Sequence, residues 1–151
     1  MPNLIKWASN QKIGLMGSFS LPAIKTCPGA TDTCKAHCYA KQGTYCYPNV
    51  RRIYQNNHRV SQGDTFVNGV VKELRHSRGI VRVHTAGDFY SVEYVRKWIE
   101  IAKKCPSITF YAYTRSWSLL TFWPSLMELA QLPNFKLLAS LDKDNANKPV
   151  P

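Results

Sequence analysis

The sequence lacks any long apolar run. Among its 151 residues, no segment approaches the roughly 20 apolar residues that a helix needs to cross a bilayer. Near the N-terminus, Ser9, Asn10 and Lys12 interrupt the apolar residues, so the continuous hydrophobic stretch of a secretion signal is missing as well. These two absences predict a soluble protein without membrane association, located in a reducing cytoplasm.

Acidic residues are scarce. The chain has 9 Asp and Glu against 20 Lys and Arg, which gives a formal net charge of +11 at pH 7. An excess of this size attracts polyanions, so nucleic acid is a candidate partner. No run of five or more basic residues occurs, however, and scattered charges are typical of a solvated surface. The basic surface therefore predicts non-specific contacts with nucleic acid, with specific binding as the less favoured alternative.

Internal repeats and low-complexity tracts are also absent. The hydrophobic content of 44% is that of an ordinary globular protein. A chain of this length buries enough surface to fold without disulfides. We therefore expect residues 1–151 to form a single domain.

Apolar periodicity predicts helices that alternate with strands. The predicted helices cover residues 63–77, 91–105 and 118–132, with Ser91 as the N-cap of the second, and the predicted strands cover 80–86, 108–114 and 135–141. This alternation indicates right-handed βαβ crossovers and a parallel sheet. The sequence thus predicts an α/β fold in which helices flank a parallel sheet.

Four of the five cysteines lie in one short segment, at Cys27, Cys34, Cys38 and Cys46. In a reducing compartment, such clusters are more often metal ligands or redox groups than disulfides. Zinc sites typically use cysteines separated by two to four residues, and only Cys34 and Cys38 have that spacing. A cubane iron-sulfur cluster accepts more varied spacing. The segment therefore favours a 4Fe-4S cluster, with zinc as the alternative, while Cys105 is expected to be a small buried side chain.

Polar residues follow the predicted strands. In parallel α/β folds, binding sites lie at the carboxyl ends of the strands, which here are followed by His84, Asp88 and Arg115. Asp88 is either a ligand-binding group or an anion at the start of the helix near Ser91. The planar fork of Arg115 could bind a carboxylate or phosphate, or form a salt bridge to Asp88 or Asp142. His84 is expected to be a core histidine.

Three ordered blocks of the sequence resemble the bacteriophage gene product 88 family. The blocks read SLPAIKTCPGATDTCKAHCYA, VHTAGDFYSVEYVRKW and FYAYTRSW, and the resemblance spans residues 18–142. The run CKAHCYA also looks like the end of the cluster loop in radical S-adenosylmethionine (radical SAM) enzymes. The resemblance thus implies a relation between this family and radical SAM iron-sulfur proteins.

That resemblance implies a cluster held by Cys27, Cys34 and Cys38 in an N-terminal cysteine-rich loop, in front of a partial (β/α) barrel. The intervals of six and three residues depart from the C-x3-C-x2-C pattern of radical SAM enzymes. Three ligands would leave one iron open to S-adenosylmethionine. Cys46 as a fourth ligand would close it and would argue against radical chemistry.

In radical SAM enzymes the strand ends also contact the cofactor, and the resemblance makes Asp88 and Arg115 the candidate cofactor-binding residues. The favoured function is that of a small viral iron-sulfur protein with a redox or electron-transfer role, which would need a redox partner. It would be located in the host-cell cytoplasm. A radical SAM enzyme with an unknown substrate is the alternative, although 151 residues is short against the roughly 200 or more of a complete barrel. A zinc-stabilised nucleic-acid-binding module is the second alternative.

Overall fold

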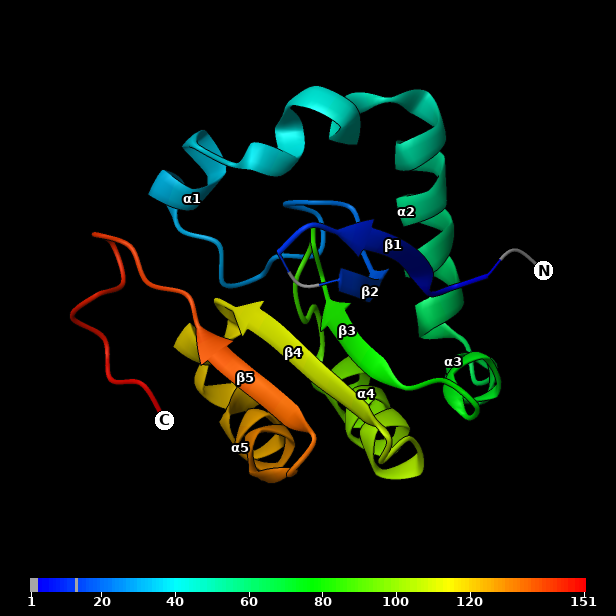
Figure 1. Ribbon diagram of the computed structural model, residues 1–151. Coiled ribbons are helices and arrows are strands. Elements are labelled where there is room, and N and C mark those ends of the chain that lie inside the picture. The colour runs from blue at the N-terminus through cyan, green and yellow to red at the C-terminus, as the bar shows by residue number, and fades with distance from the viewer. Residues whose placement is uncertain (1–2, 13) are drawn as a thin grey trace.

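The computed structural model describes residues 3–12 and 14–151. Within these residues, five strands form one sheet in the order β1-β2-β3-β4-β5 (Figure 1). The strands are β1 (Lys6–Asn10), β2 (Gly14–Phe19), β3 (Gly79–Val83), β4 (Ile108–Thr114) and β5 (Phe135–Ala139).

The sheet is mixed. β2, β3, β4 and β5 run parallel to one another, and for β3, β4 and β5 the alternation of helices and strands predicts this. β1 pairs antiparallel with β2, from Lys6 opposite Ser18 to Asn10 opposite Gly14. The expectation of a parallel sheet is therefore confirmed for the three predicted strands β3, β4 and β5. The sequence analysis did not predict β1 and β2, and the antiparallel pairing of β1 corrects the expectation of an all-parallel sheet.

Three helices pack on one face of the sheet: α3 (Phe66–Leu74), α4 (Val92–Lys104) and α5 (Trp123–Gln131). Ser91 caps α4, since its hydroxyl accepts a hydrogen bond from the backbone N–H of Tyr94. The apolar stripes of these helices form the core with alternate residues of the strands, as Trp98 does with Phe110. Figure 1 shows α4 and α5 behind the sheet and, in the described chain, no helix in front of β3, β4 and β5.

The segment that follows β2 carries the cysteines. It contains the short helix α1 (Asp32–Ala36) and two 3-10 turns, η1 (Tyr39–Lys41) and η2 (Gly43–Cys46), where an irregular loop was expected. The longer helix α2 (Pro48–Gln62) then leads to α3. None of the helices in residues 3–12 and 14–151 combines the length and the apolar character needed to span a bilayer.

Candidate functional site

A cavity of about 340 Å³ lies where the carboxyl ends of the parallel strands meet the cysteine-bearing segment. A cavity of this size is in the range that holds small ligands. Its walls come from the segments that follow β2, β3, β4 and β5, so the polar residues predicted at the strand ends do lie together. The lining includes Cys27, Cys34, His37, Cys38, Tyr39, Arg82, His84, Asp88, Tyr113, Arg115 and Asp142.

Three of the four clustered cysteines line this cavity, namely Cys27, Cys34 and Cys38. Cys46 lies outside the lining, and its thiol donates a hydrogen bond to the carbonyl oxygen of Lys41 at 2.8 Å. Cys105 is buried in the apolar core at the end of α4, as expected. The fold therefore separates the cysteines into a group of three at the cavity and two elsewhere.

The three thiols are close enough to influence one another. Burial raises the pKa of the Cys27 thiol to about 12, and the charges of Asp88, Cys34 and Cys38 add to that increase. Among the described residues, no three His, Cys, Asp or Glu side chains are close enough to hold a single metal ion. In a cubane cluster each thiolate binds a separate iron of a larger body. Three cysteines in the lining of one cavity match the donor type of such a cluster.

Two glycines allow the cysteine-bearing segment to contact the strand ends. A Cβ atom at Gly29 would lie 2.2 Å from the backbone oxygen of Arg115, so only glycine fits there. Gly87 has a φ of +84°, and a Cβ atom on it would lie 2.6 Å from atoms of Leu21 and Thr26. The segment therefore rests directly on the backbone that follows β3 and β4.

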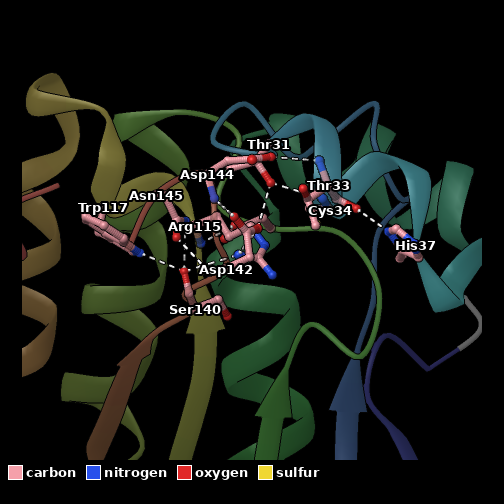
Figure 2. Close-up of polar contacts among 11 residues, drawn as sticks. Thr31, Thr33, Cys34, His37, Arg115, Trp117, Ser140, Asp142, Asp144 and Asn145 are labelled. Atoms are coloured by element: carbon pink, nitrogen blue, oxygen red, sulfur yellow. Dashed lines mark hydrogen bonds and ion pairs between the residues drawn. The ribbon is translucent and has the colours of Figure 1, made fainter. Parts of the chain in front are cut away.

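The segment is also tied to the chain that follows β5 (Figure 2). The Thr31 hydroxyl donates to Asp142 Oδ2 at 2.6 Å and accepts from the Cys34 N–H at 3.0 Å. The N–H of Thr33 donates to Asp144 Oδ2 at 2.9 Å. These bonds satisfy free N–H groups at the start of α1, and they hold the turn that carries Cys34.

Asp88 and Arg115 both line the cavity, but each is already engaged. The buried Asp88 carboxylate accepts hydrogen bonds from the Thr114 hydroxyl at 2.6 Å, the Arg115 N–H at 2.8 Å and the Phe89 N–H at 2.7 Å. Burial raises the pKa of Asp88 to about 6, against the lowering effect of these bonds. Arg115 Nη1 forms an ion pair with Asp142 Oδ2 at 2.9 Å. Both side chains therefore position the strand-end loops.

His84 is buried, as expected, but only one of its ring nitrogens has a partner. Nε2 lies 2.8 Å from the Tyr94 hydroxyl, whereas Nδ1 has no hydrogen-bond partner. Burial, with a further contribution from Arg82, lowers the pKa of His84 to about 3. Arg82 lies over the ring of Tyr113, and its Nε likewise has no partner. Sequence analysis did not identify Arg82, because a lone arginine inside a predicted strand carries no motif.

The sequence as a whole matches a known family. The profile of the family described as Gene product 88 matches residues 3–150. This chain belongs to the Gene product 88 family. It is 28% identical over 150 residues to the Gene 88 protein of Mycobacterium phage L5, and 26% identical over 152 aligned positions to that of Mycobacterium phage D29.

These alignments cover 90% and 91% of the chain but only 61% and 62% of the two Gene 88 proteins, so the chain spans about three fifths of their length. No solved structure matches the chain. The resemblance to a phage protein family is thus confirmed, while the relation to radical SAM enzymes stays a prediction. In this member of the Gene product 88 family, the cavity combines three thiols with the guanidinium of Arg82 and the imidazole of His84.

Proposed function

We propose that this Gene product 88 family member binds a 4Fe-4S cluster through Cys27, Cys34 and Cys38 and has a redox role. The presence of these three cysteines in the lining of one cavity carries the proposal. Thiolates are the ligands that iron-sulfur clusters prefer. When bound, the cluster would supply one-electron chemistry, and a redox partner would have to deliver or accept the electron.

The surrounding residues would keep the three thiols in place for this ligand. Gly29 lets the backbone next to Cys27 lie against Arg115, and the bonds from Asp142 and Asp144 hold the turn around Cys34. The partly exposed Tyr39 and Tyr113 line the cavity and would reduce access of water to it. Such supporting contacts commonly fix the orientation of metal ligands.

The position of Cys46 favours a second candidate function. Because Cys46 lies outside the cavity lining, the three remaining thiols would leave one iron without a cysteine ligand. S-adenosylmethionine is the candidate for that position, with the cavity-lining residues Asp88 and Arg115 as the expected cofactor contacts, which would require the cofactor to replace some of their present partners. Four parallel strands with the cysteine-bearing segment after the first of them are consistent with a partial (β/α) barrel. A radical SAM-type enzyme is therefore the alternative to an electron carrier.

The test of the first proposal is to purify the protein without oxygen and to measure its absorption spectrum and its iron, sulfide and zinc content. We expect iron and sulfide in the original chain and their loss in C27A, C34A and C38A. C46A and C105A are the matched controls, and both should keep the cluster. A colourless protein that contains zinc would support the zinc-stabilised module instead.

The two cluster functions differ in their response to S-adenosylmethionine. Addition of this compound to the reduced protein should change the electron paramagnetic resonance spectrum if one iron is open. An unchanged spectrum in the original chain, with a response appearing only in C46A, would show that Cys46 closes the cluster. Non-specific contact with nucleic acid is a separate prediction, and its affinity should fall steeply with salt.

A further inference from the structure

Two buried nitrogen atoms without a hydrogen-bond partner belong to side chains that line the cavity: Arg82 Nε and His84 Nδ1. Both side chains line the cavity that also contains the three thiols. The third such atom among the described residues, Trp98 Nε1, belongs to the apolar core. Buried polar groups in native proteins are nearly always paired, so two unpaired ones on side chains that line a single cavity point to a polar partner that binds there.

The contacts of His84 assign its unpaired nitrogen as a donor. The pKa of about 3 means that the ring is neutral and carries one proton. Its Nε2 lies 2.8 Å from the hydroxyl of Tyr94. A phenol is a stronger donor than a neutral imidazole, and an imidazole nitrogen is the stronger acceptor, so the bond is assigned with Tyr94 as the donor to Nε2. The proton of His84 is then on Nδ1.

The backbone at His84 adopts an uncommon conformation. Its φ is +73°, in the left-handed region that few residues other than glycine adopt, although asparagine, aspartate and histidine do so more often than the rest. Backbone strain of this kind concentrates at ligand sites, where the surrounding structure enforces it. Here the bond to Tyr94 and the ring of Phe89, at a centroid distance of 4.8 Å, hold the imidazole at the cavity wall.

The carboxylates that line the cavity accept no hydrogen bond from Arg82 Nε or His84 Nδ1. Asp88 accepts from Thr114, Arg115 and Phe89, and Asp142 pairs with Arg115. Arg82 forms no ion pair within residues 3–12 and 14–151, and its side-chain neighbours Tyr39 and Tyr113 bring no full negative charge. A ligand that satisfies both donors must therefore bring acceptor atoms and negative charge.

We propose that the cavity binds a ligand through an oxyanion group, either a carboxylate or a phosphate, that accepts hydrogen bonds from Arg82 Nε–H and His84 Nδ1–H. An oxyanion has two or more acceptor atoms, and hydrogen bonds from a guanidinium to such a group are charge-assisted and strong. The proposal concerns the cavity that holds the three thiols, but it does not require a cluster to be bound there.

The test is calorimetric titration of the full chain with acetate and with inorganic phosphate, at constant pH and ionic strength. We expect saturable binding of at least one of them, and the comparison identifies the carboxylate or phosphate preference. R82M should weaken binding about tenfold or more, because it removes a charge-assisted bond. R96M is the matched control, since it removes a cation from the exposed face of α4 and should leave binding unchanged.

Two substitutions at His84 distinguish the contributions of its two ring nitrogens to anion binding. H84Q can keep a polar contact to Tyr94 but loses the donor at Nδ1, so it should weaken binding about tenfold. H84N keeps an amide nitrogen near the position of Nδ1 and tolerates the positive φ, so it should bind within about threefold of the original chain.

Nitrogen NMR of the His84 ring gives a second readout. We expect the Nδ1–H tautomer and a shift of Nδ1 when the anion is added. The Nε2–H tautomer, the absence of saturable binding, or equal weakening by R82M and R96M would each overturn the inference. The iron content of each sample distinguishes the cluster proposal from the anion proposal. Anion binding by a protein without iron would contradict the cluster proposal and leave the anion proposal intact.

Discussion

The cysteine-bearing segment and the sheet with its helices are held by different forces. The helices α1, η1 and η2 contain no buried residue. In the sheet layer, by contrast, large side chains such as Phe66, Trp98 and Phe110 are fully buried. The layer is therefore stabilised by apolar burial, whereas the segment depends on a few directional contacts, above all those of Gly29 and Asp142.

This difference implies that the two regions respond separately to perturbation. Loss of apolar area should affect the whole molecule, because the core is shared by α3, α4, α5 and the strands. Loss of a polar contact to the segment should release the segment while the layer stays folded, since regions with few buried contacts open locally. The following predictions test this separation, from the largest expected effect to the smallest.

W98A should give the largest loss of stability. The Trp98 side chain is fully buried and packs against Phe19, Phe66 and Phe110. Truncation of a buried tryptophan typically lowers the free energy of unfolding by about 3–5 kcal/mol. Denaturant unfolding measures the change. A loss below about 1 kcal/mol, as for a surface residue, would show that the layer does not depend on this core.

G29A should have the second largest effect. The added Cβ atom would lie 2.2 Å from the backbone oxygen of Arg115, so the cysteine-bearing segment must move away. We expect a loss of about 1–3 kcal/mol in the free energy of unfolding, together with faster proteolysis of the segment. G63A is the matched control, because the nearest atom to its Cβ is 3.4 Å away. Similar behaviour of the two variants would contradict the close contact at Gly29.

Acidification should release the segment before the layer unfolds. The hydrogen bond from Thr31 is the main factor that holds the pKa of Asp142 below its ordinary value of 3.8, and bonds from Thr33 do the same for Asp144. A lowered pKa in the folded state means that this stabilisation is present above pH 3.8 and is lost as the pH falls through the lowered values.

Hydrogen exchange of the α1 amides, followed from pH 5 downwards and corrected for the intrinsic rate, measures this release. The matched comparison is the amides of α4, which should stay protected until the protein unfolds globally. Simultaneous loss of protection in both helices would mean that the segment and the layer form one cooperative unit.

Of the four perturbations, D142N should have the smallest effect. The substitution removes the negative charge that pairs with Arg115 but keeps an oxygen that can accept from Thr31. We expect faster amide exchange in α1 and unchanged global unfolding. K104M is the control, since it breaks an exposed ion pair with Glu100 on α4 and should leave α1 unaffected. Slower exchange of α1 in D142N would be opposite to the expected result.

Local sequence pattern was sufficient to predict the helices and strands from residue 63 onwards. The periodic apolar residues of α3, α4 and α5 and the β-branched and aromatic runs of β3, β4 and β5 predicted these elements to within a few residues, and Pro124 lies at the start of α5, as a proline near a helix start predicts. The prediction works because each of these elements buries one face in the core.

The helix α2 was missed, since its buried residues include Asn57 and Ser61 in place of an apolar stripe. Asn57 donates to the carbonyl oxygen of Ser20, a partner that periodicity cannot indicate.

The sequence by itself determined the family resemblance, the alternating order of helices and strands, and the cysteine-rich segment as the candidate site. The tertiary structure alone decided that Cys46 lies outside the cavity and that Arg82 and His84 meet there with unpaired nitrogens. It also decided the bond between Thr31 and Asp142, which are 111 positions apart. Short-range order follows from local pattern, whereas such contacts depend on how strand ends converge at one edge of a sheet.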